Sequence, residues 1–182
     1  MTEGLDFTAE DIELMLANLD AFSSEEALEI DRMVDELNTR TANASAYDDL
    51  IEFCKLMQPD YIVGKHHRIL ADMLMAIERG EKDRICVNIP PRHGKSQLVS
   101  IFYPAWFLGR NPDKKVMMVS HTTDLAVDFG RKVRNLIALD DYRSIFPTVR
   151  LAQDSKSAGR WNTNVGGEYY ACGIGSALAG RG

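Results

Sequence analysis

The residues with the clearest chemical potential lie in one short run, Pro90-Pro91-Arg92-His93-Gly94-Lys95-Ser96. Gly94 lets a backbone approach an anion closely, and Lys95 is a point charge of the kind that reaches the β and γ phosphates of a nucleoside triphosphate. The hydroxyl of Ser96 is of the type that binds Mg²⁺ in such sites. The run therefore predicts a phosphate-binding loop for a nucleotide, with Ser96 as the metal ligand.

The loop departs from the pattern G-x-x-x-x-G-K-[ST] at its first glycine, because position 89 holds isoleucine. Pro91 and the proline before it restrict φ instead. Arg92 adds a second fixed cation that can steady the γ phosphate as charge develops, although an exposed loop arginine is the plainer alternative. We assign the nucleotide contacts to residues 91–96, with Lys95 and Arg92 in catalytic roles and His93 as a loop residue rather than a base.

The elements that must position this loop alternate between strand and helix. Residues 84–89 are rich in apolar and β-branched side chains and predict a buried strand before the loop. A helix follows to about residue 109, in which Pro104 predicts a kink. Residues 116–120 predict a second buried strand and residues 123–139 a helix. The alternation predicts an α/β, P-loop type domain with a mostly parallel sheet covered by helices.

A hairpin is predicted near the end of the chain. Residues 160–165 and 168–173 flank Gly166-Gly167, a two-residue turn signal. Their aromatic side chains could stack on nucleic-acid bases, but alternating aromatics in a hairpin more often belong to a core; these are Trp161, Tyr169 and Tyr170.

The first part of the chain is a helical arm in our interpretation. Residues 8–19 and 23–37 have amphipathic spacing, and Ser23 with Glu26 forms a capping box for the second helix. The polar residues 38–45 predict a linker, which sets the arm at residues 1–45. Two further helices are predicted over residues 47–57 and 66–79, the second ending at Gly80.

The charge is distributed unevenly along the chain. Residues 1–50 hold 14 acidic side chains against two arginines, whereas the rest holds 13 acidic and 19 basic ones. This contrast is expected of an acidic arm in front of a domain that handles phosphates or nucleic acid, although solvated helix faces give the same count.

Composition excludes several other classes. The chain has 182 residues, 45% of them hydrophobic and 26% charged, as in ordinary globular domains. It has no apolar run of the roughly 20 residues that a membrane span requires, and its acidic start is unlike a secretory signal, so we expect a cytoplasmic protein. The three cysteines lack any CxxC spacing, and the four histidines lack metal-ligand spacing.

Four runs in this order resemble the large terminase subunits of tailed bacteriophages. They are the loop itself, Ser120-His121-Thr122-Thr123-Asp124-Leu125-Ala126, then Arg160-Trp161-Asn162-Thr163 with Gly166-Gly167-Glu168-Tyr169-Tyr170, and finally residues 173–182. The resemblance covers roughly residues 47–182. It implies an ATPase domain of the additional-strand P-loop class, a following nuclease of ribonuclease H type, and a motor in which ATP hydrolysis drives DNA into a prohead. It also implies Mg²⁺, double-stranded DNA, the small terminase subunit and the portal protein as partners, and a homo-oligomer in the host cytoplasm.

The sequence departs from that family at its end. Family members continue from the segment resembling residues 175–182 into the Walker B strand, which carries the catalytic acid, and no apolar strand ending in paired acids follows the loop here. We therefore expect residues 46–182 to be an incomplete P-loop domain, truncated before Walker B, with ATPase activity in the full-length protein only. The strand at residues 84–89 would then have an unpaired edge.

The resemblance also implies roles for residues outside the loop. The run Tyr61-Ile-Val-Gly-Lys-His-His-Arg68 resembles the region that contacts adenine, with Tyr61 and His66 as the candidate base contacts; the alternative is that His66 and His67 simply begin a helix. Arg181 resembles an arginine proposed to act in trans on a neighbour's nucleotide. Two other functions stay open: a nucleotide-binding interaction fragment that does not hydrolyse ATP, and a helicase-like DNA translocase.

Overall fold

The computed structural model describes residues 22–153 and 157–175. The chain divides into two compact units, residues 1–42 and 43–182, which we describe separately. None of the described helices is both long and apolar enough to cross a membrane.

Helix α2, Ser24–Asp48, begins as the sequence predicts. The Ser23 backbone N–H donates to the Glu26 carboxylate at 2.8 Å and the Ser23 hydroxyl accepts from the Glu26 N–H at 3.4 Å, which confirms the capping box. The linker predicted at residues 38–45 is wrong, because that stretch is helical. Apart from the half-buried Asn43, its polar residues are exposed, and Arg40 pairs with Glu36 one turn earlier at 2.7 Å. The helix predicted over residues 8–19 lies outside the described residues.

Two helices precede the loop, α3 (Leu50–Met57) and α4 (Lys65–Glu78). Asp49 caps α3 by accepting from the Ile51 and Glu52 N–H groups at 2.7 and 3.0 Å, and this cap separates α3 from α2. Arg68 on α4 donates to both carboxylate oxygens of Asp49 at 2.9 Å, so α3 and α4 are joined at their first turns. Gly80, with φ of +73°, follows α4 as the sequence predicts.

One helical run follows the loop, made of α5 (Lys95–Gln97), the π-helical turn η2 (Leu98–Phe102) and α6 (Tyr103–Arg110). The Tyr103 N–H donates to the Leu98 carbonyl, five residues back. Pro104 has no N–H and cannot donate a hydrogen bond to the preceding turn. The irregularity that the sequence predicts at this proline is the π-helical turn η2.

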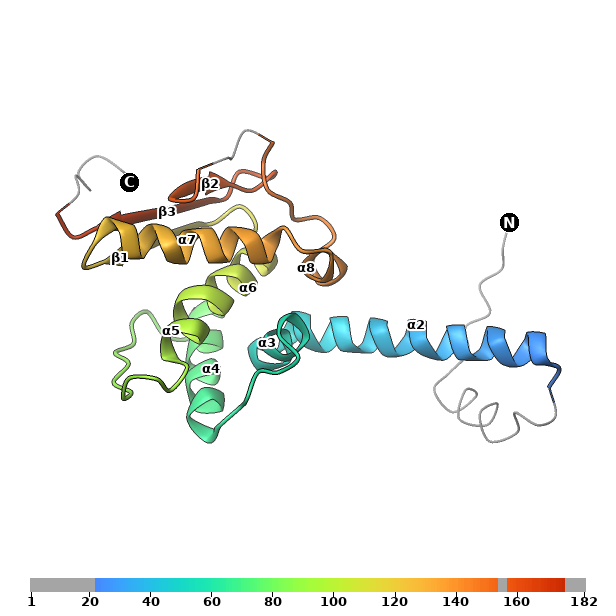
Figure 1. The fold of residues 1–182 in the computed structure, drawn as a ribbon. Helices are drawn as coiled ribbons and strands as arrows, with labels where there is room; N and C mark the ends of the chain where they lie inside the picture. The colour runs from blue at the N-terminus through green and yellow to red at the C-terminus, as the bar shows by residue number, and fades with distance from the viewer. Residues whose placement is uncertain (1–21, 154–156, 176–182) are drawn as a thin grey trace. The chain divides into compact units, whose positions relative to one another are not determined.

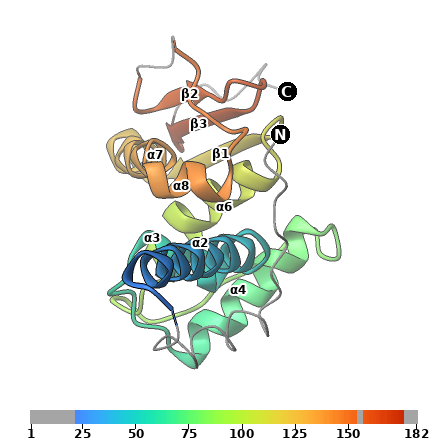
Figure 2. The ribbon, with the colours of Figure 1, turned by 90° about the vertical axis from the view of Figure 1, so that its right-hand side faces the viewer.

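The described strands form one small mixed sheet in the order β1-β3-β2. Strand β1 (Lys115–Ser120) pairs in parallel with β3 (Glu168–Gly173), with Val116 opposite Tyr169, and β2 (Arg160–Asn162) pairs with β3 antiparallel. Helix α7 (Thr123–Ile137) lies along β1 and β3, as Figures 1 and 2 show, and α8 (Asp140–Ile145), which the sequence did not predict, follows it. Gly130 permits this packing, because a Cβ there would collide with the Ala158 carbonyl. The fold is mixed α/β, and its sheet is mixed rather than mostly parallel.

The predicted hairpin is present, although residues 163–167 connect its strands in place of a two-residue turn. Trp161 and Tyr169 are fully buried. Their rings stack with centroids 4.9 Å apart and an angle of 2° between the ring planes. The core interpretation is therefore confirmed for Trp161 and Tyr169, whereas Tyr170 is only half-buried. A second aromatic cluster forms around Phe53. The centroid of its ring lies 6.0–6.3 Å from the ring centroids of Phe102, Tyr142 and Phe146.

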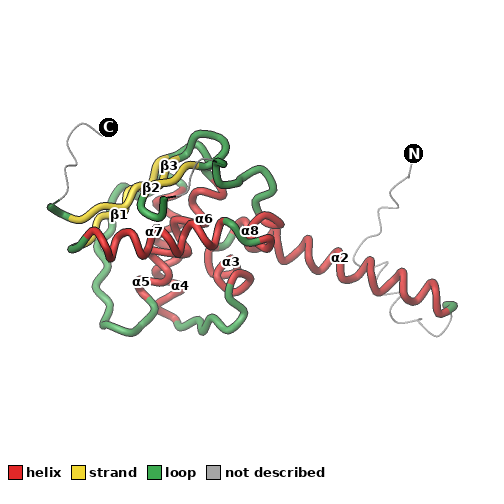
Figure 3. The backbone as a smooth tube through the Cα atoms, turned by 45° about the horizontal axis from the view of Figure 1, so that its top comes forward, coloured by secondary structure: helices red, strands yellow, loops and turns green. Residues whose placement is uncertain are grey.

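The strand predicted at residues 84–89 is not formed; Figure 3 shows the connection from α4 to α5 as loop. Exposure nevertheless alternates along it, since Ile85, Val87 and Ile89 pack partly against the core while the residues between them face solvent. No hydrogen bond between backbone groups joins these residues to another part of the chain that the structure describes. The side chains thus follow strand periodicity, but a strand also requires a neighbour for its backbone.

Candidate phosphate-binding site

The loop before α5 encloses a cavity of about 300 Å³ lined by residues 90–97. Gly94, the N-cap of α5, has φ of +72°, and Arg92 has φ of +65°. Left-handed residues in a tight turn can aim neighbouring backbone N–H groups at one point, and such concave turns bind anions. The backbone therefore has a shape suited to phosphate, at the start of a helical run whose dipole favours negative charge.

Lys95 and Ser96 follow at the mouth of this cavity. The Lys95 ammonium group donates to the Ile89 carbonyl at 3.4 Å, which folds its side chain back across the loop. Ser96 is exposed and lines the cavity, so its hydroxyl is accessible to a metal ion carried by a phosphate. Among residues 22–153 and 157–175, no group of three or more His, Cys, Asp or Glu side chains is arranged to hold a metal by itself. A metal here would need phosphate oxygens and water besides Ser96.

Three histidines meet at the back of the loop. The Nε2 atoms of His66 and His67 lie 3.2 and 3.0 Å from the same His93 carbonyl oxygen. The His93 ring turns toward its own loop, with Nδ1 2.9 Å from the Pro91 carbonyl. Carbonyl oxygens only accept hydrogen bonds, so each of these three nitrogens carries a proton.

Tyr61 lies behind the histidines rather than at the cavity. Its ring is 9% exposed and contacts the rings of His67 at 5.5 Å and Phe102 at 5.4 Å. Burial raises the pKa of Tyr61 to about 12, and its hydroxyl has no hydrogen-bond partner among the described residues. The structure thus brings Tyr61, His66 and the loop together in one cluster, with His66 next to the loop and Tyr61 in the layer behind it. Arg181 lies outside the described residues.

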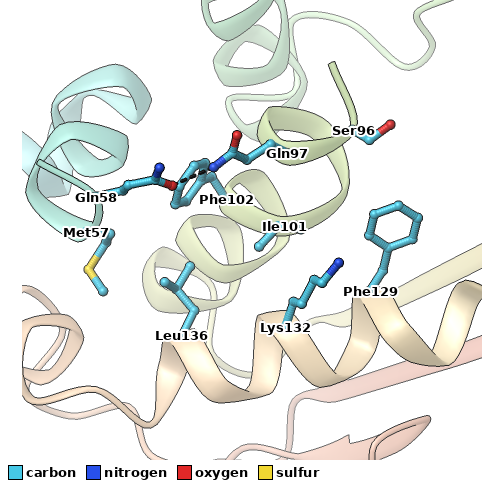
Figure 4. A pocket seen from close by; sticks show the side chains of 9 residues that line it. All are labelled: Met57, Gln58, Ser96, Gln97, Ile101, Phe102, Phe129, Lys132 and Leu136. Atoms are coloured by element: carbon cyan, nitrogen blue, oxygen red, sulfur yellow. Dashed lines mark hydrogen bonds between the residues drawn. The ribbon is translucent and has the colours of Figure 1, made fainter. Parts of the chain in front are cut away.

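An apolar groove of about 550 Å³ continues from Ser96 between the helical run and α7 (Figure 4). Gln58 and Gln97 close one side through a hydrogen bond of 2.5 Å between their side-chain amides. On α7, Phe129 and Lys132 line the other side, and the Lys132 ammonium lies 5.8 Å from the Phe129 ring centroid. Sequence reasoning missed this groove, because its walls come from three separate helices.

Sequence reasoning also did not assign His67 to the site. The signal was present, since His67 shares the spacing i, i+3, i+4, i+7 with Leu70, Ala71 and Leu74, all buried on α4. A histidine within an apolar stripe faces the interior and needs a partner there.

Gly80 and Gly94, two of the three described glycines with positive φ, give a matched test of the loop. A Cβ at Gly94 would collide with the His67 ring, whereas a Cβ at Gly80 would meet nothing within 4 Å. Each alanine variant should lose about 1 kcal/mol of stability through its positive φ. We expect Gly94→Ala also to weaken ATP binding at least tenfold, and Gly80→Ala to bind ATP like the parent protein, as measured by calorimetry. Equal ATP affinities of the two variants would contradict the loop geometry described here.

Comparison with known proteins identifies the region around the loop. No curated protein and no solved structure gives a significant match. Residues 86–154 match the family model described as terminase large subunit, T4likevirus-type, N-terminal. This match spans the loop, the helical run, β1, α7 and α8, and it confirms the resemblance seen in the sequence motifs. Terminase large subunits are an ATPase family of phage DNA packaging. Residues 86–154 of this chain are therefore similar to the N-terminal region of T4-like terminase large subunits.

Proposed function

We propose that this chain is the ATP-binding part of a phage DNA-packaging motor, in which ATP hydrolysis drives DNA translocation into the prohead. The observation that carries the proposal is the loop of residues 90–96. It has a left-handed glycine before Lys95 and Ser96 at the start of a helical run, within the segment that matches the terminase family.

Each loop residue has a proposed role. Lys95 would exchange its contact with the Ile89 carbonyl for the β and γ phosphates. Arg92, exposed at the cavity wall, would steady charge on the γ phosphate. The backbone of residues 91–95 would hold phosphate oxygens, and the exposed Ser96 hydroxyl would supply one ligand to Mg²⁺, which screens the phosphate charge when bound.

The remaining assignments rest on the family. We propose His66 and Tyr61 as contributors to the adenine site and Arg181 as an arginine acting in trans. We also propose a P-loop fold for residues 46–182 behind an arm at 1–45, with double-stranded DNA, the small terminase subunit, the portal protein and further copies of this chain as partners in the host cytoplasm.

One observation favours a second candidate, a nucleotide-binding part that does not hydrolyse ATP. The loop cavity has no acidic side chain among the described residues that line it. Hydrolysis needs a group that orients or deprotonates the attacking water, and a carboxylate is the usual one.

Separate measurements of binding and turnover test both candidates. Calorimetric titration with ATP and Mg²⁺ should show saturable binding, and AMP, which lacks the β and γ phosphates, should bind far more weakly because Lys95 has no partner on it. Phosphate release with and without double-stranded DNA then separates the motor from the non-hydrolysing candidate. If ATP binds no better than AMP, the loop is not a triphosphate site and the proposal fails.

A further inference from the structure

We propose that His67 is a positioning residue, which fixes the phosphate-binding loop to the first turn of α4 through a hydrogen bond at each nitrogen of one imidazole ring. The inference rests on the proposed function only in taking this loop to be the nucleotide site. It gives His67 a structural task at the site and no contact with nucleotide.

The first anchor lies on α4. The Gly64 backbone N–H donates to Nδ1 of His67 at 3.0 Å, while the His67 N–H donates to the Gly64 carbonyl at 3.0 Å. The contact from the Gly64 N–H to the His67 ring is one half of a capping box, with an imidazole in the place that Glu or Gln usually takes at the third helical position; glycine has no side chain for the other half, and its backbone carbonyl accepts instead. The bond from the Gly64 N–H fixes the orientation of the His67 ring, and it also fixes the tautomer, because Nδ1 must be unprotonated to accept a hydrogen bond.

The second anchor lies on the loop. With Nδ1 accepting, the single proton of the neutral ring is at Nε2, which donates to the His93 carbonyl at 3.0 Å. His66 donates to the second lone pair of the same oxygen, so this carbonyl is fully used. The loop thus cannot shift at His93 without breaking a bond that also holds the ring of His67.

Packing leaves the ring little freedom. His67 is 7% exposed, with the Tyr61 ring 5.5 Å away and the His66 ring 3.9 Å away between centroids. Gly94 approaches it so closely that a side chain there would collide with Nε2. Burial lowers the pKa of His67, which favours the neutral ring that has one donor and one acceptor.

Two substitutions of His67 test the two hydrogen bonds separately, because their amide groups lie at different numbers of bonds from Cβ. In His67→Asn the amide oxygen reaches the position of Nδ1, so the Gly64 contact is kept and the loop contact is lost. In His67→Gln the amide reaches one bond further, to the position of Nε2, and glutamine also suits the capping box. Glutamine should therefore rescue the loop contact that asparagine lacks.

The first readout needs no nucleotide. Nitrogen-15 NMR of the parent protein should show His67 protonated at Nε2 and unprotonated at Nδ1 at neutral pH. The carbon-13 shift of the His93 carbonyl should move in the asparagine variant and stay near the parent value in the glutamine variant. A ring protonated at Nδ1, or a His93 shift that is the same in both variants, would overturn the inference.

The second readout is ATP affinity by calorimetry. We expect His67→Asn to weaken ATP binding about tenfold, as for the loss of one hydrogen bond, and His67→Gln to stay within about threefold of the parent. Leu74→Val, on the same buried face of α4 two turns away, controls for general loss of stability and should leave the affinity unchanged. If asparagine lowers affinity no more than Leu74→Val, the positioning role fails. If the parent itself does not bind ATP, the proposed function fails while the NMR result still decides the inference.

Discussion

Lys95→Ala is expected to abolish measurable ATP binding while the protein stays folded. The Lys95 ammonium group, at the start of the helical run, bends back across the loop and donates to the Ile89 carbonyl at 3.4 Å. Removing it deletes charge-assisted contacts to the β and γ phosphates, which we expect to weaken binding by about 100-fold or more. The fold should tolerate the change because Lys95 belongs to neither buried aromatic cluster. Calorimetric titration with ATP and Mg²⁺ measures the effect.

A second lysine serves as the control for that experiment. Lys114 is exposed in the turn before β1, where its ammonium lies 3.9 Å from the Asp113 carboxylate. Lys114→Ala removes the same charge from the protein without touching the loop, so ATP affinity should be unchanged. Unaltered ATP affinity in Lys95→Ala would remove the basis for the phosphate site, whatever the control shows.

Trp161→Ala should have the largest effect on stability. Trp161 is fully buried, stacks on Tyr169 at 4.9 Å and donates from Nε1 to the Gly130 carbonyl at 3.2 Å. The side chain thus joins β2, β3 and α7. Truncating a buried tryptophan costs about 3–5 kcal/mol, which is a large share of the stability of a domain of this size. Urea denaturation followed by circular dichroism measures the loss.

Trp161→Phe provides the comparison. It keeps an aromatic ring against Tyr169 and removes the indole N–H, so the loss should be smaller, about 1 kcal/mol for the hydrogen bond with an added packing term. A loss below about 1 kcal/mol for Trp161→Ala would mean that the sheet and α7 do not share the core described here.

Predictions from the sequence succeeded where local chemistry decides the structure. Ser23 and Glu26 form their capping box, Gly80 ends α4 in the left-handed conformation, and Trp161 faces the interior. Each result depends on residues within a few positions, or on one apolar side chain seeking burial. At the loop, Gly94 has the positive φ that glycine permits, while the assignment of residues 91–96 to a nucleotide stays a prediction.

Predictions failed where distant residues decide. The pattern at residues 84–89 gives the alternating exposure of a strand, but pairing depends on a neighbour that no local pattern supplies. Residues 38–45 lack apolar periodicity and are nevertheless helical, because a solvated helix needs no apolar face when its flanking turns are helical. At the site, His66 and Tyr61 were assigned from the resemblance to a known family, whereas the contact of His67 with the loop required the position of the His93 carbonyl.

The backbone of the loop also affects how quickly and at what entropic cost a ligand can bind. The rings of Pro90 and Pro91 fix φ in every state of the chain. An ordinary residue loses roughly 1–2 kcal/mol of backbone entropy when it is ordered, and these prolines lose less. The bonds to His93 and the close approach of Gly94 to His67 hold the next residues in place. A ligand would therefore meet a loop already in its binding conformation. Its association rate would be limited by diffusion and by attraction to Arg92 and Lys95, since the loop does not have to fold around it.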